Sequence, residues 1–161
     1  MGQIKFARVD SRMIHGQVVT KWSKGVGSDS VYVVDDTTAK DDFMKMILEG
    51  SGKTYGFKVK VFSKEAIIEE WNNNQFGNQK VFVIFKDIPT AVDVIKAGLP
   101  TGVLNIGGVP KKADSKQINA SVFLTEQDLT SLNEIKSDQN IDVFIQTVPD
   151  TQRVNISEVK L

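Results

Sequence analysis

Residues 80–85 have the sequence Lys-Val-Phe-Val-Ile-Phe, and this run of five consecutive apolar side chains decides the fold class. A strand with apolar residues on both faces is buried on both sides, which is typical of the central strands of a parallel sheet covered by helices. We therefore expect residues 80–85 to form a central strand.

Apolar runs and helical patterns alternate on either side of this segment. Further strands are expected at 3–9, 30–34, 57–62, 102–106, 120–124 and 141–148, and the tail 151–161 is expected to add an edge strand or a short extension. Helices are expected at 16–24, 39–48 and 64–71, after Pro89 and after Thr125. This alternation predicts an α/β fold, an open, doubly wound, mostly parallel sheet of about seven strands with helices on both faces.

Helical spacing also predicts which side chains lie together. In the helix 39–48 we expect Phe43, Met44, Ile47 and Leu48 to share one face. Ser63 is expected to cap the helix 64–71, and Thr125 with Asp128 resembles a capping pair.

Composition limits the possible functions. The 161 residues suit one domain, 1–161, and the formal net charge of zero argues against a general nucleic-acid binder. The absence of cysteine excludes disulfides and thiolate zinc sites, and one histidine excludes a His-rich metal site within the chain. We expect no signal peptide, no direct membrane insertion and no cofactor.

Charge is unevenly distributed along the chain. Residues 1–24 carry five basic side chains and one acid, Asp10, a net charge of +4, so the remaining residues carry −4. The imbalance has two explanations, which are chance and an N-terminal site for an anion or an acidic partner.

The loop after the first predicted strand holds the only histidine. Residues 8–18 have the sequence Arg-Val-Asp-Ser-Arg-Met-Ile-His-Gly-Gln-Val, which puts His15 at the start of the following helix. Arg8 and Arg12 can donate paired hydrogen bonds to phosphate oxygens, and a helix N-terminus favours an anion. Gly16 permits a close backbone approach, and a neutral imidazole here could carry a phosphoryl group. A structural or merely exposed histidine is the alternative.

Asp10 has two possible roles in this loop. Its carboxylate could accept the imidazole N–H and raise the basicity of the other ring nitrogen, or it could brace an arginine. The sequence does not choose between these roles.

The segment Arg8–Thr20 resembles the signature of the enzyme IIB component of the mannose/fructose/sorbose (and N-acetylgalactosamine) family of the bacterial phosphotransferase system. The resemblance extends along nearly the whole chain. It includes Val33-Val34-Asp35-Asp36, Ala91–Gly98, the Asn-x-Gly-Gly loop at 105–108, Leu124-Thr125-Glu126 and Val148-Pro149-Asp150. Ser11 stands where many members have aspartate.

The resemblance implies a cytoplasmic phosphocarrier, peripherally associated with a membrane sugar transporter. Its histidine, here His15, accepts a phosphoryl group from a phosphohistidine of the IIA component and passes it to a sugar entering through IIC and IID. The family's loop arginines and aspartate correspond to Arg8, Arg12 and Asp10. Backbone N–H groups near Ile14, Gly16 and Gln17 are expected to complete the phosphate site. We expect no attached IIA domain and no requirement for a metal or a nucleotide, and the resemblance leaves the sugar open.

Two polar clusters are expected near the rim of this site. Asp35 and Asp36 end a strand, where they could bind magnesium, start a helix or position the first loop. Asn105, Gly107 and Gly108 end another strand, as either a structural turn or a phosphate contact.

Three other motifs are weaker. The segment Gly50–Thr54 contains Gly-Lys-Thr but lacks the first glycine and the preceding strand of a phosphate-binding P-loop. A loop with Lys111, Lys112 and Lys116 is either a solvated face or a docking site. A serine-hydrolase triad has no Gly-x-Ser-x-Gly motif to support it. The main competing hypothesis is a non-catalytic binding or regulatory module on the same fold.

Overall fold

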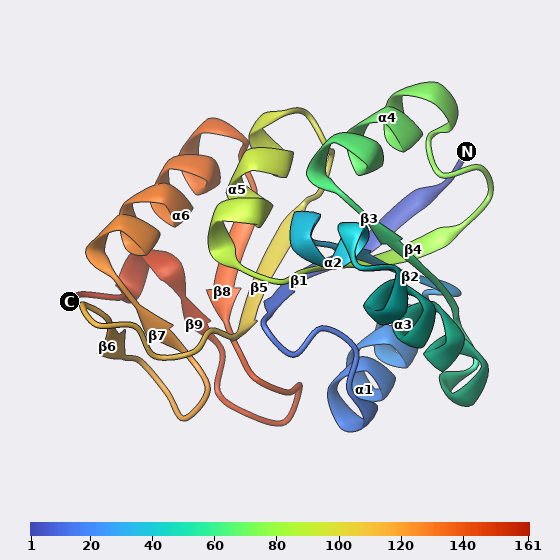
Figure 1. Ribbon diagram of the computed structural model, residues 1–161. Helices are drawn as coiled ribbons and strands as arrows, with labels where there is room; N and C mark the ends of the chain where they lie inside the picture. Colours follow the sequence, from blue (N-terminus) through green and yellow to red (C-terminus); the bar gives the residue numbers. More distant parts are fainter.

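The computed structural model describes residues 1–161, except for the side chains of Gln17 and Val18. Within the described chain, seven strands form one sheet in the order β3-β2-β4-β1-β5-β8-β9 (Figure 1). These strands are β1 (Gln3–Asp10), β2 (Ser30–Val34), β3 (Lys58–Phe62), β4 (Lys80–Phe85), β5 (Val103–Gly108), β8 (Asp142–Ile145) and β9 (Val154–Asn155). All neighbours are parallel except β8 and β9, so the predicted fold class is confirmed.

Helices cover both faces of the sheet, as Figure 1 shows. One face carries α1 (Gly16–Val26) and α3 (Asp42–Tyr55), and the other carries α4 (Lys64–Asn74), α5 (Ile88–Lys96) and α6 (Glu126–Asp138). The short helix α2 (Asp36–Lys40) follows β2 directly, and a 3-10 turn, Ile156–Glu158, lies near the end of the chain. The two layers give two separate cores, one on each side of the sheet.

Strand β4 is central, as predicted, with β2 on one side and β1 on the other. Its side chains alternate between the two cores. Val81, Val83 and Phe85 belong to the α5 and α6 side, while Phe82 and Ile84 belong to the α1 and α3 side. Each of these five side chains is at most 1% exposed, because both faces of the strand are covered.

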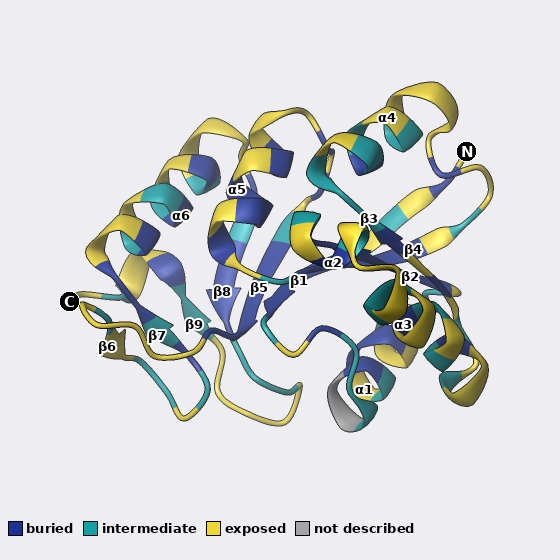
Figure 2. Ribbon diagram, in the orientation of Figure 1, coloured by how far each residue is buried: buried dark blue, intermediate teal, exposed yellow. Residues whose placement is uncertain are grey.

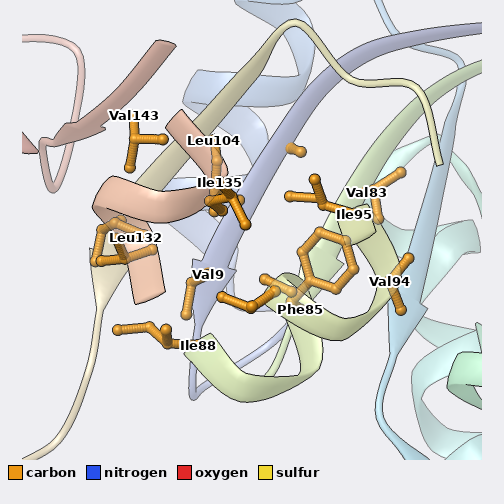
Figure 3. Close-up of a cluster of buried hydrophobic side chains, with 14 of the residues drawn as sticks. Val9, Val83, Phe85, Ile88, Val94, Ile95, Leu104, Leu132, Ile135 and Val143 are labelled. Atoms are coloured by element: carbon orange, nitrogen blue, oxygen red, sulfur yellow. The ribbon is translucent and has the colours of Figure 1, made fainter. Parts of the chain in front are cut away.

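Figure 3 shows the larger core from within. Val83 and Phe85 of β4 lie against Ile88, Val94 and Ile95 of α5, and the same cluster continues to side chains of α6. The order of the strands also fixes the place of the site. Because the chain runs outward to β3 and then returns to β4 beside β1, the carboxyl end of β1 lies where the strand order reverses, which is the usual place for ligands in such sheets.

The strand prediction is wrong for residues 120–124. Only Phe123–Leu124 (β7) are extended there, and they pair antiparallel with Lys116–Gln117 (β6) in a separate two-stranded sheet. The amide oxygen of Asn119 accepts hydrogen bonds from two backbone N–H groups, of Ser121 and Val122, which closes a turn where a strand was expected. The seventh strand of the main sheet comes instead from the tail, as β9.

The helix prediction for 39–48 is also corrected. The helix is broken at Asp41, whose carboxylate accepts a hydrogen bond from the Met44 N–H at 3.1 Å and so starts α3 as a new helix. The four apolar residues that were expected to share one face differ in exposure, because Leu48 is buried while Phe43 is 65% exposed and Ile47 is 46% exposed. Strand β8 ends at Ile145, earlier than expected, so residues 146–148 leave the sheet at its carboxyl edge.

The exposures of two phenylalanines predict opposite effects on stability. Phe85→Ala removes a fully buried ring and should lower the free energy of unfolding by about 3–5 kcal/mol. Phe43→Ala, on the exposed side of α3, should change it by less than about 0.5 kcal/mol. Urea unfolding of both variants checks this, and a Phe43→Ala loss as large as that of Phe85→Ala would contradict the position of α3.

Candidate functional site

The candidate site lies in the loop between β1 and α1. Asp10 is the last residue of β1, and His15 is the N-cap residue of α1. The loop turns tightly, because the Met13 N–H donates to the Asp10 carbonyl at 3.0 Å and the Ser11 N–H donates to the Gly108 carbonyl at 3.0 Å. Met13 has a φ of 58°, a left-handed conformation that few non-glycine residues adopt. The loop is therefore held in one specific shape.

Asp10 is the centre of the site. Its Oδ2 accepts from Arg8 Nη2 at 3.1 Å and is 3.2 Å from His15 Nε2, while its Oδ1 accepts from the Arg12 backbone N–H at 3.0 Å. Burial raises the pKa of Asp10, but the Arg8 charge and the Arg12 N–H outweigh burial and hold the pKa below its usual range. The side chain is therefore a carboxylate at neutral pH. Asp10 contacts both His15 and Arg8, so the geometry is compatible with each of the two roles that the sequence left open.

The carboxylate favours one tautomer of His15. A carboxylate can only accept, so in the neutral ring the Nε2 that faces it carries the proton and Nδ1 has the lone pair. Among the described residues, none makes a capping hydrogen bond with the His15 side chain. The ring is 23% exposed, so it remains accessible from outside. A neutral imidazole with a free Nδ1 is a nucleophile.

Arg8 is placed differently from the expectation that it holds phosphoryl oxygens. Its side chain is fully buried, and Nη1 donates to Asn105 Oδ1 at 2.5 Å and to the Gln146 carbonyl at 3.2 Å. The guanidinium also lies 5.6 Å from the ring centre of Trp22. Burial lowers the pKa of Arg8 and the Asp10 carboxylate opposes that shift. These partners occupy its donors, so Arg8 acts on His15 through Asp10.

Gly107 and Gly108 make room for this buried ion pair. A Cβ on Gly107 would overlap the Arg8 guanidinium carbon and both terminal nitrogens, and one on Gly108 would lie 2.7 Å from Asp10 Oδ1. Both glycines lie in strand β5, so the expected structural turn is wrong. The Asn105 amide nitrogen donates to the same Gln146 carbonyl at 3.0 Å. Asn105, Gly107 and Gly108 of β5 therefore pack against the buried ion pair of Arg8 and Asp10.

Arg12 is the arginine that faces outward. Its side chain is 53% exposed, and only its Nε approaches Asp10 Oδ1, at 3.4 Å. Ile14 is half-buried beside it. Gly16 begins α1, and a Cβ there would lie 3.7 Å from the Tyr55 hydroxyl, which is ordinary contact, so packing does not require a glycine. Gln17 was also expected at the phosphate site, and its side chain lies outside the described residues.

Asp35 and Asp36 lie beside this loop without contacting His15. The Asp35 carboxylate caps α2, accepting from the Thr38 N–H at 3.0 Å and from its hydroxyl at 2.7 Å. The Thr38 hydroxyl is also 3.8 Å from the Met13 sulfur, which connects α2 to the loop. Asp36 accepts from the Lys64 N–H at 2.8 Å, at the start of α4. Asp35 therefore starts a helix, as one of the expected alternatives had it, and Asp36 accepts a hydrogen bond at the start of α4.

Two contributors were missed from the sequence. Trp22 stacks on Phe6 and donates from Nε1 to the Thr147 carbonyl at 3.1 Å, and the Gln146 carbonyl accepts from Arg8. Residues 146 and 147 follow β8 at the carboxyl edge of the sheet. Ligand sites in such sheets lie beyond the carboxyl ends of the strands, so these residues could have been identified if the end of β8 had been predicted correctly.

The remaining motifs stay outside the site. Gly50–Thr54 lies inside α3, so it forms no phosphate-binding loop. In the described part of the chain, no group of three His, Asp or Glu side chains is arranged to hold a metal ion. Within that same part, no helix is long and apolar enough to cross a membrane. Lys112 lies 3.6 Å from Asp128, and Lys111 and Lys116 are exposed.

The chain is similar to known proteins over almost its whole length. The family model for the PTS system sorbose subfamily IIB component matches residues 4–160. The N-acetylgalactosamine-specific phosphotransferase enzyme IIB component 1 of Escherichia coli (strain K12) is 33% identical over 159 residues, which cover 96% of this chain and 97% of that protein. The sorbose-specific EIIB component of Lacticaseibacillus casei is 38% identical over 132 residues, 82% of this chain and 80% of that protein. The crystal structure of manxB from Thermoanaerobacter tengcongensis superposes with a TM-score of 0.88 at 42% identity, covering 98% of this chain and 94% of that one.

The space around Arg8 predicts a selective effect of adding a methyl group. Gly107→Ala should lower the free energy of unfolding by at least about 2 kcal/mol, because the new Cβ displaces a buried, paired arginine. Gly102→Ala is the matched control, since a Cβ there meets nothing within 4 Å. Urea unfolding compares the two, and equal stability of both variants would disprove the packing of Arg8 against β5.

Proposed function

The chain belongs to the sorbose subfamily of IIB components of the phosphotransferase system, and on that premise we propose that His15 carries a phosphoryl group between two partners. The donor is a phosphohistidine of a IIA protein, and the acceptor is a sugar entering through the membrane components IIC and IID. Residues 1–161 act as a single IIB domain at the cytoplasmic side of that transporter. The observation that carries the proposal is the buried Asp10 carboxylate held on Nε2 of His15.

We propose that Nδ1 is the phosphoryl acceptor. Its lone pair forms the new P–N bond as the P–N bond of the donor breaks and the donor imidazole leaves with that electron pair. The His15 ring gains positive charge in this step, and Asp10 stabilises it through the Nε2 hydrogen bond. In the second transfer a sugar hydroxyl attacks phosphorus, the P–Nδ1 bond breaks, and the hydroxyl proton leaves to a base or to water.

The charge on the transferring phosphoryl oxygens needs donors that are free to point outward. Arg12 supports this role, because its side chain is 53% exposed while Asp10 holds it close to His15. The N–H groups of the first turn of α1 have no partners within the helix and add a second set of donors. Transfer from the donor histidine to His15 depends on positioning and charge stabilisation more than on acid–base catalysis, because the leaving group and the attacking group are both imidazoles.

Phosphorylation of His15 is the direct test of the proposed function. The protein is incubated with phosphoenolpyruvate, enzyme I, HPr and a panel of IIA proteins of this sugar class, and its intact mass is measured. We expect a gain of one acid-labile phosphoryl group, which His15→Ala abolishes. A wild-type chain that gains none from demonstrably phosphorylated IIA proteins would favour a binding or regulatory module without transfer.

Arg12 is expected to affect the rate and not the fold. Arg12→Ala should slow transfer to His15 by about 10²-fold, because it removes a donor to charge that develops in the transition state. Its free energy of unfolding should change by less than about 1 kcal/mol, since the side chain is mostly exposed. Rapid-quench measurements with labelled phosphoryl donor check this. Lys160→Ala, another exposed cation, is the control, and an Arg12→Ala rate equal to that of the control would remove Arg12 from the site.

A further inference from the structure

Helix α3 carries a stripe of large hydrophobic side chains that the fold leaves exposed. Phe43 is 65% exposed, Met46 63% and Ile47 46%, and their spacing puts all three on one side of the helix. Figure 2 shows the exposed side of α3 directed away from the sheet. Among the described residues, the other exposed large hydrophobic side chain is Met1, at the amino end of β1. We call Phe43, Met46 and Ile47 the α3 stripe.

The stripe is not needed to attach α3 to the sheet. Leu48 and Gly52 form the buried side of the helix, and Gly52 packs so closely that a Cβ there would overlap the Phe57 carbonyl. Exposed apolar clusters of this kind usually mark a surface that a partner covers, because the centre of an interface is more apolar than its rim.

Helix α3, which bears the stripe, is connected to the site loop by two sets of contacts. At the start of α3, the Asp41 N–H donates to the Thr38 carbonyl at 3.1 Å, and the Thr38 hydroxyl is 3.8 Å from the sulfur of Met13, two residues before His15. At the other end, the Tyr55 hydroxyl lies beside Gly16, the residue after His15. The helix that bears the stripe therefore borders the site loop at both of its ends.

The reaction requires that a partner cover this region. A protein that delivers a phosphoryl group directly must bring its own histidine onto His15. A specific interface buries about 800 Å² on each partner, a disc of roughly 16 Å radius, so surfaces that border the site loop fall inside it. The α3 stripe is the exposed apolar part of that area in the described chain.

The charges beside the stripe identify the chemistry of the partner. Residues 11–28 contain Arg12, Lys21 and Lys24 and no acid, and all three side chains are exposed. Helix α1, which bears two of them, packs on the same face of the sheet as α3. Helix α3 itself carries two acids, Asp42 and Glu49, and two lysines, Lys45 and Lys53, so its own charges cancel. The combination fits a protein surface with an apolar centre and an acidic rim.

We propose that the α3 stripe is the docking surface for the phosphoryl-donor protein, whose matching face has an apolar centre and an acidic rim beside its phosphohistidine. This proposal rests on the proposed function of His15. The stripe supplies the apolar contact, and Arg12, Lys21 and Lys24 orient the donor by charge. Loss of the stripe should weaken encounter with the donor without changing the chemistry at His15.

The test separates docking from chemistry with two phosphoryl donors. Phe43→Gln, Met46→Gln and Ile47→Gln are combined in one variant, and Thr130→Gln, Glu134→Gln and Ser137→Gln on α6 form the matched control. Each is phosphorylated by a phosphorylated IIA protein that serves the wild type, and separately by phosphoramidate, a small donor that needs no docking surface. We expect kcat/KM for the IIA protein to fall at least tenfold in the stripe variant, mainly through KM. The rate of the stripe variant with phosphoramidate should stay within twofold of the wild-type rate, and its midpoint of thermal unfolding should be unchanged. The control variant should match the wild type in both rates and in its midpoint of thermal unfolding.

Two results would overturn the proposal. The first is a stripe variant that keeps the wild-type kcat/KM with the IIA protein; if that variant also loses binding to phosphatidylserine-containing vesicles, the stripe binds a lipid surface instead. The second is a parallel fall in the phosphoramidate rate, which would mean that the substitutions disturb His15 itself. A wild-type chain that accepts phosphate from phosphoramidate but from no IIA protein would overturn the proposed function and the docking surface together.

Discussion

The buried ion pair between Arg8 and Asp10 is the interaction on which the rest of the site depends. Removing two charges from water costs several kcal/mol for each, so such a pair persists only when other groups satisfy the remaining donors and lone pairs. Here Asn105 and the Gln146 carbonyl complete Arg8, and the Arg12 N–H and His15 complete Asp10. The pair thereby joins the ends of β1, β5 and β8, three neighbouring strands.

The proposed function gives this buried charged network a role at the end of the sheet. The carboxylate that Arg8 holds in place is the one that fixes the proton of His15 on Nε2 and leaves Nδ1 free. A histidine on a mobile loop would have to adopt the reactive orientation in each encounter with a partner. An imidazole that is hydrogen-bonded to a carboxylate at the end of the sheet already has a fixed orientation. The arginine that meets the phosphoryl group, in our proposal, is the second one, Arg12, which is partly exposed for that purpose.

Much of the fold followed from the sequence because burial on both faces leaves an unmistakable pattern. The run at 80–85 predicted a central strand, and the position of His15 after the first strand predicted the site at the carboxyl edge. The local sequence pattern could not distinguish β7 from a strand of the main sheet, because an extended segment has the same pattern whichever strand it pairs with. It also could not reveal that Asp41 restarts a helix and leaves Phe43 outside, since an apolar stripe at helical spacing is the same whether it meets the core or a partner.

The roles within the site were harder to predict than its location. Two arginines in one loop look equivalent in sequence, yet Arg8 belongs to the strand and points into the sheet while Arg12 belongs to the loop. The purpose of Gly107 depends on a contact across two strands, which no local signal shows. Long-range packing therefore decides which arginine is buried beside Asp10 and which stays exposed in the loop.

The nitrogen chemistry of His15 tests the central claim most directly. Protein labelled with nitrogen-15 in its imidazole is measured by two-dimensional NMR before and after phosphorylation. We predict that the neutral ring of the free protein carries its proton on Nε2 and that the phosphoryl group is on Nδ1 afterwards. A neutral ring with its proton on Nδ1, or a phosphoryl group on Nε2, would contradict the role assigned to Asp10.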